Sequence, residues 1–209
     1  NAKGASAILM DVYTGEVISV ASLPTFDPNN RPRPPVSGDP SDSPLFNRAV
    51  QGVYELGSTF KIFAAAQAIE LGLVNASSMV DADAPMKWGK FTIKEFRGHN
   101  YGPLLSVTDV IVKSSNVGTA RMAMQIGAKR QKEFLSALGF FEPTAVELVE
   151  APGAKPLLPP RWSEINTITI SYGHGLSASP LHLATAYASL LNGGTKVTPT
   201  LLKRNAPEP

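Results

Sequence analysis

The chain of 209 residues carries 19 Lys and Arg against 17 Asp and Glu, a formal net charge of +2, and contains no cysteine. The charge forms no Lys/Arg block, which excludes the clustered basic face typical of a nucleic-acid binder. The lack of cysteine excludes disulfides, thiolate catalysis and cysteine-ligated metals. With 43% hydrophobic residues the composition indicates a folded protein, and no apolar run reaches the roughly 18 residues of a membrane-spanning helix.

The N-terminal residues predict a β-hairpin over Ser6–Ser22, with apolar arms on either side of a turn that contains Asp11 and Gly15. Both faces of the first arm are apolar, so we expect the sheet to be covered on both sides. Seven of the 18 prolines follow between Pro24 and Pro44. Because proline fixes φ and removes a donor, this stretch is interpreted as an irregular surface loop or linker.

Helical spacing dominates the centre of the chain. The first helix is expected from near Ser58 to Gly72, with one face formed by Ile62, Ala66, Ile69 and Leu73. After the proline-rich segment Pro143–Pro160, a last helix opens with Ser179 as N-cap and Pro180 in its first turn. Its buried stripe is predicted at Leu183, Tyr187 and Leu190, and its end at Asn192-Gly193-Gly194. Three further helices are predicted between these two: Ser106 to about Lys113, about Val117 to Ile126, and Gln131–Leu138.

The first candidate for catalysis is the segment Glu55–Lys61, which places Ser58 and Lys61 three residues apart at a predicted helix start. Residues at i and i+3 share a face, so the Lys61 amine is expected to reach the Ser58 hydroxyl and to act as its base. Lysine is a base only when neutral, and at pH 7 an unperturbed lysine costs roughly 4.6 kcal/mol to deprotonate. Burial or a second cation would lower that cost. Taken alone, the pattern is more typical of an N-cap serine and a surface lysine, because Ser-x-x-Lys is a common spacing.

The second candidate is Ser114-Ser115-Asn116, in the turn between two predicted helices. A hydroxyl and an amide two residues apart can point into one cleft, where the hydroxyl relays a proton and the amide binds a peptide-like substrate. Taken alone, these are also ordinary cap residues between helices. His174 and His182 lie in no metal-binding spacing, and both are interpreted as structural.

In this order and separation, the two candidates resemble the Ser-x-x-Lys and Ser-x-Asn motifs of the transpeptidase domain of penicillin-binding proteins. The resemblance covers nearly the whole chain and is closest to the division-type, septal members of class B. The further segments that carry it are Asp11–Val17, Pro24–Asn29, Asn47–Val50, Tyr54–Ser58, Ser171–Leu176, Thr185–Tyr187 and Asn192–Gly194.

The resemblance implies the α+β fold shared by penicillin-binding transpeptidases and serine β-lactamases. In that fold an antiparallel sheet is packed by helices beside an all-helical lobe. Residues 1–209 would be one transpeptidase domain that is incomplete at its C-terminus. The chain would hold the helical lobe and the N-terminal hairpin of the sheet, without the C-terminal strands.

The implied activity is D,D-transpeptidation of peptidoglycan stem peptides in septal cell-wall synthesis, through a serine acyl-enzyme. Ser58 would be the nucleophile and Lys61 its base, while Ser114 would pass the proton to the leaving amine and Asn116 would bind the substrate amide. β-Lactams would acylate Ser58, and no metal or organic cofactor and no nucleic acid is implied. The implied location is the periplasmic face of the cytoplasmic membrane, among cell-division membrane proteins, with an anchoring N-terminal segment outside this chain.

One motif of the family is missing from the sequence. The third motif, Lys-Thr-Gly or Lys-Ser-Gly, is absent, and Gly194-Thr195-Lys196 has similar letters in another order. The family places that motif on a strand downstream of Pro209. It supplies a cationic wall and one of two oxyanion donors, and loss of one such donor costs ~10²–10³ in rate. We therefore expect a chain that ends at Pro209 to be nearly inactive.

Two alternatives share the scaffold. A serine β-lactamase or β-lactam sensor is the nearest, but class A enzymes usually carry Ser-Asp-Asn and class D enzymes Ser-x-Val where this chain has Ser114-Ser115-Asn116. A non-catalytic division scaffold is the other, and its mark would be the loss of Ser58 or Lys61, both of which are present.

Overall fold

Residues 2–204 are described by a computed structural model in which the chain forms two units. Within the described residues, the first unit comprises 2–54, 136–157 and 177–204, and the second comprises 55–135 and 158–176. Helices and short antiparallel strands both occur, as the α+β prediction requires. The N-terminal hairpin belongs to the first unit, and Ser58, Lys61, Ser114 and Asn116 all belong to the second.

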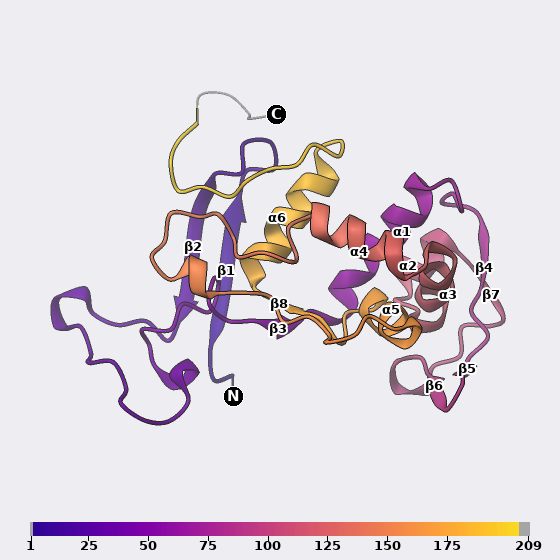
Figure 1. Cartoon of the computed structure of the whole chain (residues 1–209), viewed down its shortest axis with the longest axis horizontal. Coiled ribbons are helices and arrows are strands. Elements are labelled where there is room, and N and C mark those ends of the chain that lie inside the picture. The colour runs from indigo at the N-terminus through magenta and orange to yellow at the C-terminus, as the bar shows by residue number, and fades with distance from the viewer. Residues whose placement is uncertain (1, 205–209) are drawn as a thin grey trace. The chain divides into compact units, whose positions relative to one another are not determined.

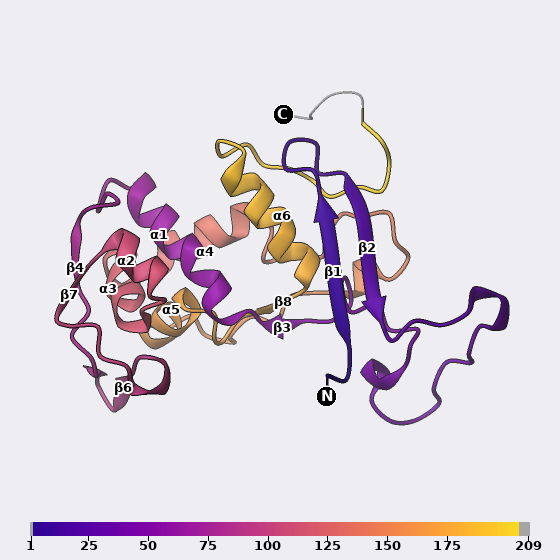
Figure 2. The same ribbon diagram turned by 180° about the vertical axis from the view of Figure 1, so that it is seen from behind.

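The predicted hairpin is present in the first unit, where β1 (Ala5–Met10) pairs antiparallel with β2 (Val17–Leu23). Asp11 fixes the turn, since its Oδ1 accepts hydrogen bonds from the amides of Tyr13 and Thr14 at 2.9 and 2.8 Å. One face of the hairpin packs against α6 (Pro180–Leu191), which runs beside β1 in both ribbon views (Figures 1 and 2).

The other face of the hairpin is exposed, which corrects the expectation of a sheet covered on both sides. The exposed fractions are 58% for Leu9 and 63% for Ile18, because no element of residues 2–204 packs over them. The alternation of side chains along a strand places Ile8 and Met10 on the opposite face, where they pack with Val50.

Helix α6 begins as predicted, with the Ser179 hydroxyl accepting the amide of His182 and Pro180 in the first turn. Its predicted stripe is only half-buried, and the buried face is instead Leu181, His182, Thr185, Ala186, Ala188 and Ser189. The Thr185 hydroxyl donates to the carbonyl of Leu181 at 2.8 Å, and the Ser189 hydroxyl to that of Thr185 at 3.0 Å. The hydroxyls of Thr185 and Ser189 therefore have hydrogen-bond partners inside the core. A prediction based on apolar residues alone does not expect these side chains to be buried.

The helices α1 (Lys61–Glu70), α2 (Val107–Val112), α3 (Asn116–Ile126) and α5 (Glu164–Ser171) pack against one another in the second unit (Figure 1). Two start and stop signals are confirmed. Ser106 caps α2 through the amide of Asp109 at 3.0 Å, and Gly127 ends α3 with a φ of 81°.

The predicted face of α1 is wrong. Ile69 and Leu73 are 46% and 37% exposed, and the apolar residues that α1 buries are Phe63, Ala64, Ala65 and Ala68. Small alanine side chains let α1 approach α3 closely, so the packed face is not the face with the largest side chains. The sequence does not predict helix α5, although Ser163 and Asn166 form a capping box at its start. It also does not predict two antiparallel pairs, β4 (Met79–Asp81) with β7 (Leu104–Ser106) and β5 (Met86–Trp88) with β6 (Phe91–Ile93).

Among residues 2–204, no helix is both long and apolar enough to cross a bilayer.

The proline-rich loop after β2 is irregular, as predicted, apart from two short 3₁₀ turns capped by Asp27 and Asp39. Helix α4 begins at Ala128, three residues before its predicted start, because its first turn follows directly on Gly127. The remaining elements are β3 (Tyr54–Glu55), β4 (Met79–Asp81), β5 (Met86–Trp88), β6 (Phe91–Ile93), β7 (Leu104–Ser106), α4 (Ala128–Ala137), β8 (Ser177–Ala178) and the 3₁₀ turns Pro28–Asn30, Pro40–Asp42, Gly57–Phe60, Phe96–Gly98 and Ala151–Gly153.

Candidate active site

Ser58 is exposed in the 3₁₀ turn Gly57–Phe60 that leads into α1. It is not the N-cap that the sequence also allowed, because its backbone is already helical and no side-chain cap bond forms at either helix start. A hydrogen bond holds this turn in place, since the backbone N–H of Gly57 donates to the carbonyl of Gly173 at 3.1 Å. Gly173 has a φ of 87°, and a Cβ there would lie 2.0 Å from the Gly57 carbonyl oxygen, so only glycine fits. The hydroxyl is thus presented to solvent on a fixed support.

Lys61 is the first residue of α1, and its side chain is 3% exposed. Its amine donates to the Ser114 hydroxyl at 2.9 Å and to the Ser114 carbonyl oxygen at 2.5 Å. The structure therefore brings Lys61 and Ser114 together from segments 53 residues apart. Within residues 2–204, the Lys61 amine forms no hydrogen bond with the Ser58 hydroxyl, although the sequence predicts that it reaches it.

The environment of Lys61 lowers the free-energy cost of its neutral form. Burial lowers the pKa of the Lys61 amine to about 8, and the negative charge of Glu95 acts in the opposite direction. At pH 7 the cost of deprotonation falls from the roughly 4.6 kcal/mol of an unperturbed lysine to about 1.4 kcal/mol. The lysine can therefore serve as a general base near neutral pH.

Ser114, Ser115 and Asn116 form the turn that joins α2 to α3. Ser114 has a φ of 58°, in the left-handed region that non-glycine residues seldom occupy. Ser115 is fully buried and caps α3, since its hydroxyl accepts the amide of Gly118 at 2.9 Å. Asn116 begins α3, and its side-chain amide nitrogen donates to the carbonyl of Lys94 at 2.9 Å. This bond uses one of the two N–H donors of the side chain, so the second N–H and the oxygen can both serve a ligand.

Glu95 belongs to this site, and the sequence analysis missed it. Glu95 follows β6 and is 3% exposed. Its carboxylate accepts hydrogen bonds from the Ser115 hydroxyl at 2.5 Å and from the backbone N–H of Asn116 at 2.6 Å. It also accepts from the amide of Val117 at 3.2 Å. Nothing in the local sequence marks Glu95, because its partners lie 20 to 22 residues further along the chain.

Glu55 and His174 are paired in the same unit, with 3.0 Å between the Glu55 carboxylate and His174 Nδ1. Glu55 also accepts from the amide of Gly175 at 2.7 Å. The hydrogen bond from His174, followed by that from Gly175, lowers the pKa of the Glu55 carboxyl. Both side chains are about half exposed. This pair fastens the segment before Ser58 to the segment that follows α5.

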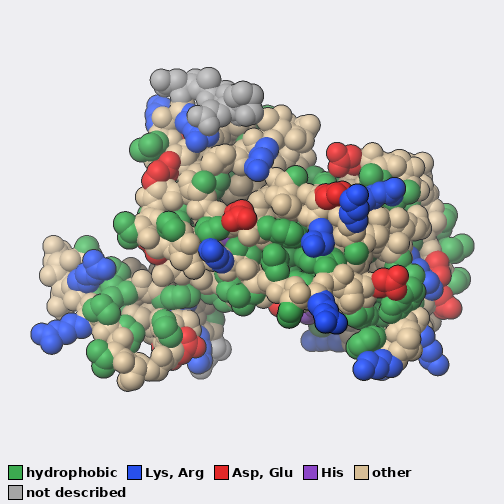
Figure 3. Space-filling view, in the orientation of Figure 1, with side chains coloured by type: hydrophobic (Ala, Val, Ile, Leu, Met, Phe, Trp, Pro, Cys, Tyr) green, Lys and Arg blue, Asp and Glu red, His purple; other side chains and the backbone are tan. Residues whose placement is uncertain are grey.

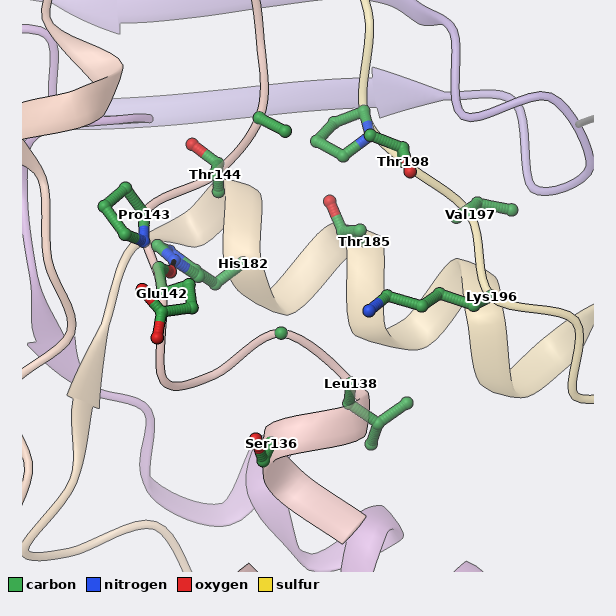
Figure 4. A pocket seen from close by; sticks show the side chains of 13 residues that line it. Ser136, Leu138, Glu142, Pro143, Thr144, His182, Thr185, Lys196, Val197 and Thr198 are labelled. Atoms are coloured by element: carbon green, nitrogen blue, oxygen red, sulfur yellow. Dashed lines mark hydrogen bonds between the residues drawn. The ribbon is translucent and has the colours of Figure 1, made fainter. Parts of the chain in front are cut away.

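The first unit contains a separate cavity of about 210 Å³, shown in Figure 4. His182 and Thr185 of α6 line it together with Glu142, Thr144 and Lys196, and none of the predicted site residues reaches it. His182 is structural, as predicted, since its ring bonds the Ser179 hydroxyl at 2.7 Å and the Glu142 carbonyl at 2.8 Å. On the face drawn in Figure 3, Lys and Arg side chains are interspersed with hydrophobic and acidic ones. Within residues 2–204, no group of three or more His, Asp or Glu gathers as a metal site.

Comparisons with known proteins agree with the motifs. A family model described as the penicillin binding protein transpeptidase domain matches residues 5–208. The chain is 38% identical to the probable peptidoglycan D,D-transpeptidase FtsI of Caulobacter vibrioides over 205 residues, which cover 98% of this chain and 33% of that protein. It is 34% identical to the peptidoglycan D,D-transpeptidase FtsI of Escherichia coli over 209 residues, covering 100% of this chain and 34% of that protein. The chain thus spans about a third of the length of these curated relatives.

The likeness extends to solved structures. The chain superposes on the apo structure of the TP domain from Burkholderia pseudomallei penicillin-binding protein 3 with a TM-score of 0.80 and 28% sequence identity. The match covers 99% of this chain and 56% of that chain. A peptidoglycan glycosyltransferase from Burkholderia ambifaria matches with the same TM-score and identity, over 97% of this chain. The predicted α+β fold class is therefore confirmed.

Proposed function

The chain belongs to the penicillin binding protein transpeptidase domain family, and we propose that it carries the nucleophilic half of a peptidoglycan D,D-transpeptidase active site. The observation that carries the proposal is the buried Lys61 amine, whose pKa is lowered to about 8 and which contacts Ser114 at 2.9 Å. Ser58 lies three residues before it on a locked, exposed turn. A nucleophile, a base and a proton carrier are thus held on three neighbouring segments of one unit.

The substrate is proposed to be the stem peptide of peptidoglycan, cleaved between its two terminal D-alanines. The Ser58 oxygen bonds to the carbonyl carbon of the penultimate residue while its proton passes to the neutral Lys61 amine. The C–N bond to the terminal D-Ala then breaks, and the Ser114 hydroxyl passes a proton from the Lys61 ammonium to the leaving amine. An ester on Ser58 remains. The Asn116 side-chain oxygen, whose neighbouring nitrogen is engaged by Lys94, accepts a hydrogen bond from a substrate amide.

A second stem peptide completes the reaction. Its amine attacks the ester carbonyl carbon, and the C–O bond to Ser58 breaks as the new amide bond cross-links the two peptides. The proton released by the amine returns to the Ser58 oxygen through Ser114 and Lys61. A β-lactam would acylate Ser58 by the same first step, with its ring amide in place of the D-Ala–D-Ala bond. Neither step uses a metal or an organic cofactor.

The septal role, the division-protein partners and the location on the periplasmic face of the cytoplasmic membrane are proposed from the likeness to the FtsI proteins. We further propose that a Lys-Thr-Gly or Lys-Ser-Gly motif downstream of Pro209 completes the oxyanion site. A protein ending at Pro209 should then acylate ~10²–10³-fold more slowly than one that includes the motif. Equal labelling of the two by a fluorescent penicillin would contradict this part of the proposal.

The decisive experiment is a turnover assay on the intact protein with a donor pentapeptide and an amine acceptor. We expect release of D-alanine together with a cross-linked product, both measured by mass spectrometry and both lost in Ser58→Ala. The same preparation should hold a penicilloyl ester for longer than one turnover of the peptide. Rapid hydrolysis of penicillin without cross-linking would instead identify a β-lactamase, and absence of both activities would identify a non-catalytic scaffold.

A further inference from the structure

The turn that carries Ser114 and Asn116 is held by a carboxylate from a distant segment. Glu95 is 3% exposed, and both of its oxygens face the start of α3. Its Oε1 accepts from the Ser115 hydroxyl at 2.5 Å and the Val117 amide at 3.2 Å, and its Oε2 accepts from the Asn116 amide at 2.6 Å. All three partners are hydrogen-bond donors, which a carboxylate can accept. Two of them are backbone N–H groups in the first turn of α3, where the helix itself provides no acceptor.

From this geometry we infer that Glu95 is a positioning residue for the acyl transfer, which it supports by fixing the Ser114–Asn116 turn against Lys61. The inference rests on the proposed function, because Ser114 and Asn116 act on substrate only there. Glu95 itself makes no contact with the substrate in this scheme. It acts through the residues that do.

The backbone of Ser114 explains why such a clamp is needed. A φ of 58° is unfavourable for serine and persists only where the surroundings over-determine it. Glu95 holds the two residues that follow, while the Lys61 amine holds the Ser114 carbonyl at 2.5 Å. Lys94, the neighbour of Glu95, binds the Asn116 side chain through its carbonyl. Residues 94 and 95 together therefore determine which way Ser114 and Asn116 face.

The same carboxylate also connects the clamp to the base. Its negative charge raises the pKa of Lys61 against the larger effect of burial, while Lys94 and Lys113, which adjoin Glu95 and Ser114 in the sequence, are exposed. Removing the charge should therefore lower the Lys61 pKa further. Removing the clamp should slow acylation. Substitution of Glu95 should therefore change both the pKa of Lys61 and the rate of acylation, and the two changes can be measured separately.

The test is the rate of acylation of the intact protein by a fluorescent penicillin, measured from pH 6 to 9 for three variants. Glu95→Gln keeps the size but offers an NH₂ group to donors, so we expect about a 10²-fold loss of rate, the cost of a misplaced catalytic group. Its half-maximal pH should move below that of the wild type. Glu95→Asp keeps the charge on a shorter stem, and should lose less rate with an unchanged half-maximal pH. Glu70→Gln, an exposed carboxylate at the end of α1, is the matched control and should behave as wild type.

The outcomes separate the two proposals. If the wild type is not acylated at all, the proposed function fails. If the wild type is acylated and Glu95→Gln matches it in rate and in half-maximal pH, the role of Glu95 is overturned. A slower Glu95→Gln with an unmoved half-maximal pH also overturns it, since general destabilisation would do the same. Should Glu95→Gln fail to fold, as judged by its thermal unfolding, Ser115→Ala removes one clamp contact with the charge in place. It should slow acylation without moving the pH midpoint even at temperatures where its unfolding curve shows it fully folded, which separates the effect from general destabilisation, and a wild-type rate would contradict the inference.

Discussion

The Lys61 amine lies 2.9 Å from the Ser114 hydroxyl and contacts the Ser114 carbonyl as well, so the lysine of the first motif is hydrogen-bonded to the second motif. The helical spacing of Ser58 and Lys61 alone suggests a different partner. Under the proposed function, the neutral Lys61 amine takes the proton of Ser58, and the contact with Ser114 would give that proton a route toward a leaving group. The two motifs therefore act as one hydrogen-bonded unit.

Ser58→Ala should abolish labelling by a fluorescent penicillin in the intact protein while leaving its stability unchanged to within about 0.5 kcal/mol. The reason is that Ser58 is exposed and its side chain caps no helix. Peptide mapping of the labelled wild type and thermal unfolding of the variant provide the two measurements. Ser77→Ala, an exposed serine of the same unit, should label normally. A label found on a peptide without Ser58 would show that the nucleophile is misassigned.

Lys61→Arg should lower the acylation rate by about 10²–10⁴-fold, the usual contribution of a general base. Arginine keeps the positive charge but does not deprotonate in a protein. Stopped-flow acylation with a chromogenic cephalosporin measures the effect. A near wild-type rate in Lys61→Arg would mean that Lys61 contributes only its charge.

The pH dependence of acylation should follow the Lys61 amine. Its pKa is lowered to about 8 by burial, and only the neutral form is a base, so the rate should rise about tenfold per unit at low pH and level off above pH 8. The half-maximal rate is expected near pH 8. Rates measured from pH 6 to 9 at fixed ionic strength check this. A rate that falls as the pH rises through this range would exclude Lys61 as the base.

Gly173→Ala should impair both stability and acylation. The new methyl group would stand 2.0 Å from the Gly57 carbonyl oxygen, in addition to the strain of a φ of 87°. Gly139→Ala is the matched control, because Gly139 has a φ of 89° and no atom within 4 Å of its Cβ position. The control should lose about 1–2 kcal/mol of stability from the backbone alone. Gly173→Ala should lose more in chemical denaturation and should also label slowly, since Ser58 sits on the turn it displaces. Equal losses in the two variants would contradict the close approach.

The elements that the sequence predicted well are those with local signals. Ser106, Ser179 and Gly127 mark helix ends through contacts with residues at most four positions away, and the hairpin turn is fixed by Asp11 in the same local manner. Helix α5 was missed because it is rich in β-branched residues such as Ile165 and Thr167, which have low helix propensity and are held there by packing on α3.

The candidate site divides in the same way. Spacing and family likeness predict Ser58, Lys61, Ser114 and Asn116 as site residues, but they do not predict that Lys61 contacts Ser114. The contact of Lys61 with Ser114 spans 53 residues, and Glu95 reaches Ser115 across 20. Such contacts depend on how the segments pack, and a single sequence carries no periodic signal for them.

The backbone of Ser114 limits what evolution can do at this position. The turn requires a left-handed residue, and the contact with Lys61 requires an aliphatic hydroxyl. Glycine and asparagine accept that backbone but have no hydroxyl, while threonine has the hydroxyl on a branched β-carbon that this conformation disfavours. Serine alone combines the two properties. If Ser114 carries the proton as proposed, variants that escape an inhibitor directed at Ser58 are expected to change other positions, because a replacement of Ser114 gives up either the favourable backbone or the hydroxyl.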